Sequence, residues 1–171
     1  GRANYTLLDR YLFTFTARYD GSSRFADGHR WGFFPSASGA WVISKEKWMK
    51  PLTFITNAKL RAGYGLSGNQ AGIDSYNSME LIQPNGIVSV NGAPTVTLGI
   101  IRNANPDLKW EIKRTFNVGL DIALWQSRIV MSLDYYRSKT TDLLYVYDVP
   151  VPPFTYDKLL ANLGSMRNSG L

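Results

Sequence analysis

The sequence predicts an all-β protein, a segment of about six strands from an antiparallel, up-and-down transmembrane β-barrel. Three observations predict it: apolar and polar residues alternate over long runs, the connections alternate between short and long, and 13% of residues are aromatic. A globular strand has about 5–6 residues, whereas a tilted strand crossing a bilayer needs roughly 9–11. Within hydrocarbon every backbone polar group must pair inside the protein, so such strands belong to a closed wall.

The clearest predicted strand covers residues 110–124, where every second residue is apolar or long-stemmed. Successive side chains of a strand point to opposite faces, so Phe116, Val118 and Leu120 are expected to face lipid. Asn117 and Gly119 are expected on the other, water-facing side. We therefore expect an Asp at Val118 or Leu120 to impair assembly more than an Asp at Asn117 or Gly119.

Three strands are predicted before it, at about residues 9–20, 31–43 and 59–67. The Asp20–Gly21–Ser22–Ser23 stretch has turn chemistry, and Pro35, which cannot donate to a ladder, predicts a bulge or local break. Alternation stops over residues 45–57, where one helical turn ended by Pro51 is expected.

The rest of the chain predicts two more long strands, at about 128–147 and 161–171. The tight connection 125–127 precedes the first, and the polar end of that strand is expected to project beyond the bilayer. Residues 68–108 are too long for an ordinary loop and are expected to carry short strands at 87–90 and 95–101. Since barrels of this type have short periplasmic turns and long outer loops, connections 20–30, 68–108 and 148–160 are assigned outside, and 44–58 and 125–127 inside.

Composition excludes several classes of function. The chain is 44% hydrophobic, but no apolar run approaches the roughly 18 residues of a membrane helix. The net charge of +6 is spread over strand ends and loops, which indicates solvated surface charge rather than a nucleic-acid site. The absence of cysteine removes disulfides and thiolate chemistry. With no initiating Met or signal peptide, the chain is expected to be an internal segment of a longer protein.

One motif matches the dinucleotide-binding fingerprint, Gly63-x-Gly65-x-x-Gly68. That fingerprint needs a following helix to hold a pyrophosphate, and residues 69–72 are a poor helix start. We interpret the glycines as structural, in a strand and its loop.

The candidate catalytic residues are also unpromising. Glu111 and Asp121 would lie about 33 Å apart along one strand, far beyond the roughly 5–10 Å of glycosidase carboxylates. With Asp134 they are interpreted as polar residues facing a water-filled lumen. His29 is the only histidine and lies in a loop, so neither a metal site nor Ser/His/Asp catalysis is expected.

Membrane-facing positions give further expectations. Arg114 and Arg137 interrupt the apolar faces of their strands and are expected to snorkel to headgroups. Trp31, Trp110 and Tyr135 are predicted in an outer aromatic girdle and Trp41 in an inner one. Stacking on sugar rings stays open for Tyr76 and Trp48, which lie in connections.

Local motifs add a resemblance to the SusC/RagA-type TonB-linked outer-membrane transporters. It rests on motifs in the family's order over nearly the whole chain: residues 20–25 (DGSSRF), 30–36 (RWGFFPS), Trp41 with Ser44 and Glu46, 60–65 (LRAGYG), 68–70 (GNQ), 108–111 (LKWE), 134–136 (DYY) with Thr140, Asp142, Leu143 and Leu144, and 162–164 (NLG) with Met166, Asn168 and Gly170.

The resemblance implies part of a roughly 22-stranded barrel whose lumen holds a plug. It also implies import of nutrients such as glycans or peptides, powered by TonB and assisted by a SusD-type surface lipoprotein, in the outer membrane of a Gram-negative, Bacteroidetes-like bacterium. No plug domain, TonB box or carboxy-terminal strand signal is seen in the sequence, so residues 1–171 are expected to be barrel alone.

The sequence therefore predicts a non-enzymatic wall segment, without catalytic, cofactor or metal residues, in contact with outer-membrane lipid. Its substrate-binding residues are unknown, and its long outer loops, mainly 68–108, are expected to meet the lid lipoprotein or substrate. The alternative is a soluble β-sandwich that binds carbohydrate, because a sandwich strand also has one apolar face. Strand length favours the barrel.

Overall fold

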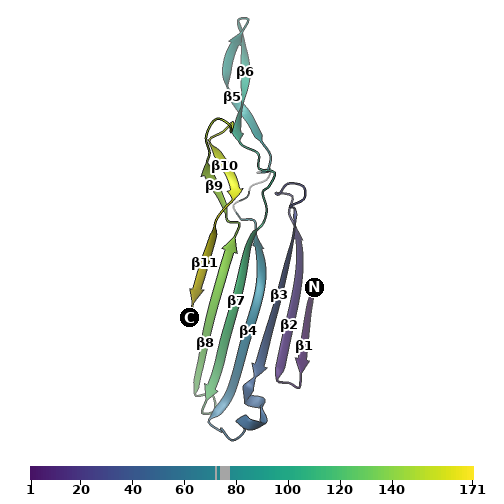
Figure 1. Ribbon diagram of the computed structural model, residues 1–171, viewed down its shortest axis with the longest axis vertical. Coiled ribbons are helices and arrows are strands. Elements are labelled where there is room, and N and C mark those ends of the chain that lie inside the picture. Colours follow the sequence, from purple (N-terminus) through teal and green to yellow (C-terminus); the bar gives the residue numbers. More distant parts are fainter. Residues whose placement is uncertain (72, 74–77) are drawn as a thin grey trace.

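A computed structural model describes residues 1–71, 73 and 78–171 of the chain. Seven strands form one antiparallel sheet in the order β1-β2-β3-β4-β7-β8-β11, and two further hairpins stand beyond one end of it (Figure 1). The sheet strands are β1 (Arg2–Leu7), β2 (Tyr11–Gly21), β3 (Trp31–Val42), β4 (Ile55–Asn69), β7 (Glu111–Leu124), β8 (Ile129–Thr141) and β11 (Ser165–Gly170). The hairpins are β5 (Leu81–Val90) with β6 (Ala93–Arg102), and β9 (Leu144–Asp148) with β10 (Lys158–Asn162).

Strand β1 was not among the six predicted strands. It pairs with β2 through a tight turn in which Leu8 and Asp9 have φ of 52° and 53°. Asn and Gly are the residues that usually adopt this left-handed conformation in tight turns. Because this turn contains neither, the sequence does not clearly predict it. The predicted strand 9–20 corresponds to β2, which begins at Tyr11 because this turn takes the preceding residues.

The predictions for β3 and the segment after it are largely confirmed. Pairing between β2 and β3 passes Pro35 without a register shift, so the predicted bulge is wrong there. Pairing between β3 and β4 starts at Ser36, the residue after the proline, so Pro35 does mark the end of that ladder. The helical turn appears as two 3₁₀ turns, η1 (Ile43–Lys45) and η2 (Lys47–Met49).

The two last predicted strands are each divided in the structure. The run 128–147 separates into β8 and β9 at Asp142, whose φ is 58°, and the run 161–171 separates at Gly164, whose φ is 83°. Strand β9 therefore leaves the sheet and pairs with β10, instead of prolonging β8. The Asn162 side chain holds the junction, because its Nδ2 donates to the carbonyls of Asp142 (2.9 Å) and Lys109 (2.7 Å).

The connections gather at two ends of the sheet, as their lengths predict. The β5–β6 and β9–β10 hairpins and the β2–β3 loop lie at one end, here called the upper end (Figure 1). The β1–β2 turn, the 3₁₀ turns and the 125–127 turn lie at the other, lower end. The expected short strand 87–90 is the outer part of β5, and the expected strand 95–101 covers most of β6.

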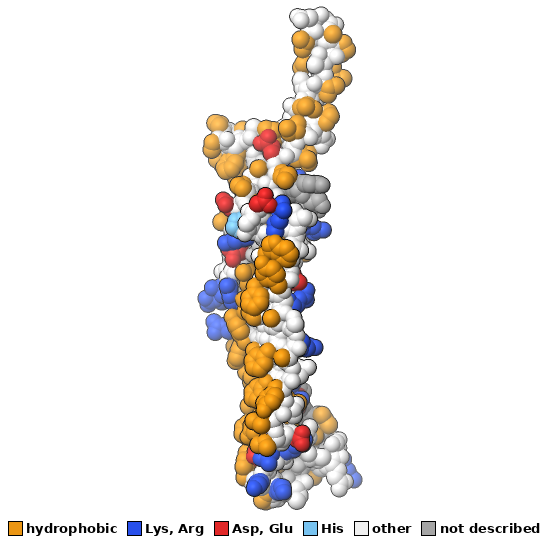
Figure 2. All heavy atoms as spheres, turned by 90° about the vertical axis from the view of Figure 1, so that its right-hand side faces the viewer, with side chains coloured by type: hydrophobic (Ala, Val, Ile, Leu, Met, Phe, Trp, Pro, Cys, Tyr) orange, Lys and Arg blue, Asp and Glu red, His pale blue; other side chains and the backbone are white. Residues whose placement is uncertain are grey.

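The two faces of the sheet differ in chemistry, as the alternation predicts. Residues paired across antiparallel strands share a face, and the rows Phe15–Ala37–Tyr64–Phe116 and Leu60–Leu120–Leu133 define an apolar face. Seen from the β1 side, hydrophobic side chains form a stripe along the sheet (Figure 2). We call the opposite side the polar face.

The sheet is a single layer, which contradicts the β-sandwich alternative. A sandwich requires a second sheet packed on the apolar face. Both further hairpins instead continue beyond the upper end (Figure 1), and Phe15, Tyr19 and Phe33 remain 54%, 64% and 58% exposed on the apolar face. No helix among the described residues is long and apolar enough to cross a bilayer.

A small hydrophobic core lies at the upper end, where loops meet the strands. It consists of Phe25, Phe34, Ile73, Leu108, Trp110 and Leu160. The ring of Trp110 packs on Phe25 at a centroid distance of 4.9 Å and on Phe34 at 5.4 Å. Because Trp110 is only 9% exposed, the prediction that it belongs to a lipid-facing girdle is wrong. Its ring instead packs the loops against the strands.

Candidate functional site: the polar face of the wall

The polar face carries short and polar side chains from every strand of the sheet. One row across it runs Asn4, Thr14, Ser38, Gly63, Asn117, Tyr136 and Gly170. Alternation places these residues there, since each lies one position from an apolar-face residue of its strand. The result is a surface suited to water rather than to hydrocarbon.

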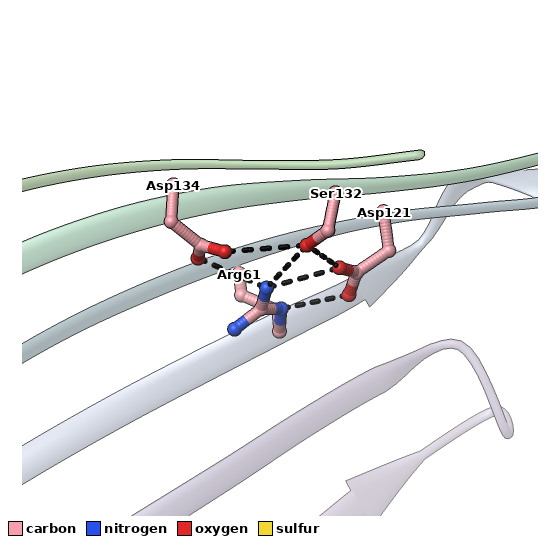
Figure 3. A network of polar contacts seen from close by, with 4 residues as sticks. All are labelled: Arg61, Asp121, Ser132 and Asp134. Atoms are coloured by element: carbon pink, nitrogen blue, oxygen red, sulfur yellow. Dashed lines mark hydrogen bonds and ion pairs between the residues drawn. The ribbon is translucent and has the colours of Figure 1, made fainter. Parts of the chain in front are cut away.

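A four-residue network of Arg61, Asp121, Ser132 and Asp134 lies on this face (Figure 3). The strand bounds place it in the half of the sheet nearer the lower end. The Arg61 guanidinium donates to both carboxylate oxygens of Asp121, from Nε at 2.7 Å and from Nη2 at 3.0 Å. The same Nη2 donates to Asp134 Oδ1 at 3.0 Å. The Ser132 hydroxyl donates to Asp121 at 2.7 Å, so the network joins β4, β7 and β8.

The network is a set of ion pairs and hydrogen bonds, and its geometry does not indicate a catalytic site. Two carboxylates face the Arg61 guanidinium, and Lys59 lies opposite Asp121 on the same face, so positive and negative charges balance here. Side-chain exposures of 36%, 32% and 52% for Arg61, Asp121 and Asp134 leave the network in contact with water. Both carboxylates already accept hydrogen bonds. The geometry therefore provides a hydrated, charge-balanced surface and no evident proton donor.

Glu111 lies apart from that network, at the upper end of β7. Its carboxylate accepts from Asn69 Nδ2 at 3.2 Å and from the Leu144 amide at 3.3 Å. The structure thus brings together two of the three candidate carboxylates, Asp121 and Asp134. It keeps Glu111 separate, as the spacing along the strand predicts.

The glycines of the dinucleotide-like motif all lie within β4, which ends at Asn69, and no helix follows among the described residues. Each glycine has a close neighbour that a Cβ would crowd. A Cβ at Gly63 would lie 2.6 Å from Asn117 Oδ1, one at Gly65 would lie 3.0 Å from Ser36 Cβ, and one at Gly68 would overlap the Phe34 ring. The interpretation of the motif as structural is therefore supported by specific contacts.

The other candidates occupy isolated positions. His29 lies in the β2–β3 loop, and the described residues contain no group of three His, Asp or Glu side chains able to hold a metal. Trp48 lies in η2 and is 59% exposed. Tyr76 lies outside the described residues.

A second polar cluster, at the lower end, locks the β1–β2 turn to the 3₁₀ turns. Glu46 accepts from Arg10 Nη1 at 3.0 Å, from the Tyr11 hydroxyl at 3.0 Å and from Trp41 Nε1 at 3.1 Å. The hydrogen bonds from Trp41 and Tyr11, together with the Arg10 charge, lower the pKa of Glu46 below its ordinary value. Trp41 also stacks with Tyr11 at 6.3 Å, which places it at the lower rim as predicted.

The remaining predicted positions on the apolar face are found there. Trp31 stacks on Tyr19 at a centroid distance of 5.0 Å and stays 63% exposed, and Tyr135 is 41% exposed. Arg114 lies in the same face and donates to Thr141 Oγ1 at 3.0 Å. Arg137, opposite Phe116, is exposed.

Sequence reasoning did not foresee that Arg61 joins Asp121 and Asp134. The alternation does put Arg61 on the polar face of its strand, and that is the only available signal. Its partners depend on the β4–β7–β8 register, in which Arg61 lies opposite Gly119 and Gly119 lies opposite Asp134.

Comparison with known proteins gives a consistent family. A family model of the TonB-dependent receptor-like β-barrel matches residues 1–171. The chain is 40% identical to TonB-dependent receptor P26 of Formosa agariphila over 99% of its length, and 39% identical to TonB-dependent receptor SusC of Bacteroides thetaiotaomicron over its full length. It spans 17% of the length of each of these relatives.

Solved structures agree with the sequence comparison. A chain of the RagAB peptide importer in its closed-closed state superposes with a TM-score of 0.86 at 30% identity, covering 98% of this chain and 18% of that one. The siderophore receptor PirA of Pseudomonas aeruginosa superposes with a TM-score of 0.62 over 99% of this chain and 28% of that one, at 18% identity, which shows a shared fold alone.

The two-faced open sheet and its upper-end hairpins are therefore part of a larger closed structure, and the chain belongs to the TonB-dependent receptor family as a β-barrel segment of the SusC/RagA type.

Proposed function

We propose that residues 1–171 form part of the barrel wall of an outer-membrane importer driven by TonB. The observation that carries the proposal is that the large apolar side chains gather on one face of a single-layer sheet and most polar ones lie on the other. The apolar face would contact lipid, because its large side chains are exposed and nothing else in the described chain covers them. The polar face would line the lumen and pack near a plug. In this role the segment is structural and non-enzymatic.

The strand lengths support a membrane-spanning wall. Strands β2, β3, β4, β7 and β8 have 11, 12, 15, 14 and 13 residues. Tilted barrel strands need roughly 9–11 residues to cross a bilayer. The proposed location is the outer membrane of a Gram-negative, Bacteroidetes-like bacterium, since the similar receptors include those of Bacteroides and Formosa.

The β5–β6 hairpin supports contact with a surface partner or a substrate. It projects from the upper end (Figure 1), and residues 81–101 contain no charged side chain. Ile87, Val96 and Leu98 are 71%, 57% and 69% exposed. A lone two-stranded hairpin is only marginally stable, and exposed apolar clusters commonly mark interaction sites. A SusD-type lipoprotein is the proposed partner.

The proposed cargo is a nutrient of the glycan or peptide class. One similar protein of known structure is named as a peptide importer. The lumen-facing Arg61 network offers a hydrated, charge-balanced surface with no preference between glycans and peptides. No lumen residue in this segment is assigned to recognition of a particular substrate.

The test is growth of a strain that lacks the full-length gene, on a panel of oligosaccharides and oligopeptides as sole nutrient. We expect loss of growth on one class, and rescue by the full-length gene only where TonB is functional. Replacing residues 84–97 by a short Gly/Ser turn should lower nutrient uptake and co-purification of the lipoprotein, while the barrel still assembles. Undiminished growth on every nutrient after gene deletion would contradict the import proposal.

A further inference from the structure

Four cations occupy the upper end of the otherwise apolar face, and we call them the basic patch. They are Arg114 on β7, Arg137 and Lys139 on β8, and Arg167 on β11. Arg114 lies opposite Lys139, and Lys139 lies opposite Arg167. Paired residues share a face, and Arg137, two residues from Lys139, shares it as well.

The patch is compact enough for one anionic group to touch several of its members. Neighbouring strands lie about 4.8 Å apart, and residues two apart on a strand lie about 7 Å apart. The four Cα atoms therefore fall within about 12 Å of one another. Arginine and lysine side chains are long and flexible enough to converge over that distance.

No carboxylate of the seven strands lies beside this charge on the apolar face. The apolar-face positions of the seven strands include no Asp or Glu. Among described residues, Arg137, Lys139 and Arg167 have no ion pair or hydrogen bond, and Arg114 has only Thr141, at 3.0 Å. Asp142, beyond the end of β8, is ion-paired with Lys109 at 2.9 Å, and its charge also acts on Arg114, so it offsets at most one of the four cations.

This arrangement is unfavourable without an added anion. Like charges directly opposite one another in a sheet are destabilising, and Arg114, Lys139 and Arg167 form such a row across three strands. Snorkelling explains how a single cation is tolerated at a membrane surface. It does not explain why four cations converge where Asp142, shared with Lys109, is the carboxylate acting on them within the described chain.

The height of the patch matches a headgroup layer. Arg137 lies eight residues beyond Ile129 at the lower end of β8, which is about 27 Å along the strand and about 21 Å in height at a tilt of about 40°. The apolar band of an outer-membrane barrel is about 25 Å tall. At the lower end the same face presents uncharged residues instead, among them Leu7, Trp41 and Ile129.

We propose that the basic patch binds the phosphate groups of anionic lipid headgroups in the outer leaflet. A phosphate offers several acceptor oxygens, and guanidinium groups match it through paired, charge-assisted hydrogen bonds. The assignment of the leaflet rests on the proposed membrane orientation. The patch holds an annular lipid at one side of the wall, on the face opposite the lumen.

The test uses the full-length transporter, purified in neutral detergent and titrated with diphosphorylated lipid A, and bound lipid is counted by native mass spectrometry. We compare the wild type with the R137Q/K139Q/R167Q variant, which spares the Thr141-bonded Arg114. Each cation near an anionic surface contributes about a factor of five in affinity, so the variant should bind roughly a hundredfold more weakly. Enzymatically dephosphorylated lipid A should bind equally to the wild type and to the variant.

The matched control, K45Q/K47Q/K50Q, removes the same charge from the lower-end connection and should bind like the wild type. The proposal is wrong if both variants lose lipid A binding to the same extent, or if neither variant loses it. Displacement of lipid A by millimolar inorganic phosphate would mean a site for free anions, and loss of a barrel–barrel complex without loss of lipid would mean a protein interface. The heat-modified gel mobility of each variant checks that its barrel has assembled. Nutrient uptake should persist in every variant. Loss of lipid A binding with normal uptake therefore tests the lipid site independently of the import proposal.

Discussion

At the scale of single residues, polar side chains on this wall act in small groups rather than alone. Arg61 joins three strands through two aspartates and a serine, and Glu46 joins a turn to a 3₁₀ segment. The Arg61 group is partly exposed, so its ion pairs are expected to change local stability by modest amounts. Glu46 is buried, at 9% exposure, and its hydrogen bonds replace the water that burial removes. Both groups connect particular strands and turns to one another.

The Arg61 network predicts an unequal pair of coupling energies. Asp121 accepts two hydrogen bonds from Arg61 and Asp134 accepts one, so the first coupling should be larger. Both should be about 1 kcal/mol or less, because partly solvated ion pairs are screened. Double-mutant cycles with Arg61→Ala, Asp121→Asn and Asp134→Asn, read from unfolding of the refolded full-length barrel, measure both. Equal couplings would mean that the bidentate geometry adds nothing.

The Glu46 cluster predicts a pH dependence of stability at the lower end. The pKa of Glu46 in the folded state lies below its ordinary 4.5, so the unfolded chain binds more protons there. The stabilisation is therefore present above about pH 4.5 and is lost as pH falls through the folded-state pKa. Thermal unfolding of the full-length barrel, measured from neutral pH to about pH 3, should show this loss.

Glu46→Gln supplies the comparison for that measurement. The variant should be less stable at neutral pH, because its ion pair with Arg10 is gone. It should also lose less stability on acidification than the wild type. If the thermal stabilities of the two proteins change in parallel with pH, Glu46 is not the carboxylate that causes the loss of stability in acid.

At the scale of strands, alternation decides which side meets lipid. Val118 lies six residues from the lower end of β7, near mid-height of the apolar band, opposite Ala62 and Tyr135. An Asp there would place a charge in hydrocarbon at a cost of up to about 2 kcal/mol. We expect Val118→Asp and Leu120→Asp to reduce the heat-modifiable, assembled fraction of the full-length barrel in outer membranes.

Asn117→Asp is the matched control, since its side chain faces the lumen. Gly119, the other position where a mild effect is expected, is a less suitable control, because a Cβ there would lie 2.8 Å from Arg61 Nη2 and would overlap the Asp134 carboxylate, so the Arg61 network would have to shift. Assembly as poor for Asn117→Asp as for Val118→Asp would contradict the assignment of faces.

The elements show what alternation can and cannot predict. The strand 110–124 is found as β7 within one residue, because fifteen residues of unbroken alternation leave one interpretation. The break at Asp142 is missed because the residues on both sides continue to alternate, and only a left-handed backbone diverts β9 to β10. Trp110 has the right parity for a lipid-facing residue, and only the folded loops show that Phe25 and Phe34 cover it.

At the scale of the whole molecule, the sheet has two free edges and one uncovered apolar face. Its outermost strands, β1 and β11, each pair on one side only within the described chain. Unpaired edges and exposed apolar surface promote association. Residues 1–171 expressed alone should therefore aggregate in aqueous buffer, as judged by size-exclusion chromatography. A monodisperse monomer with cooperative unfolding would contradict this expectation.

The tip of the β5–β6 hairpin has a practical consequence. Asn91 and Gly92 turn the chain with φ of 54° and 82°, at the point farthest from the sheet. A short epitope inserted there should be reached by antibodies added to living cells, whereas the same epitope after Lys50 should be detected only once the outer membrane is permeabilised. The hairpin thus offers a fluorescent handle for following single transporters on the bacterial surface.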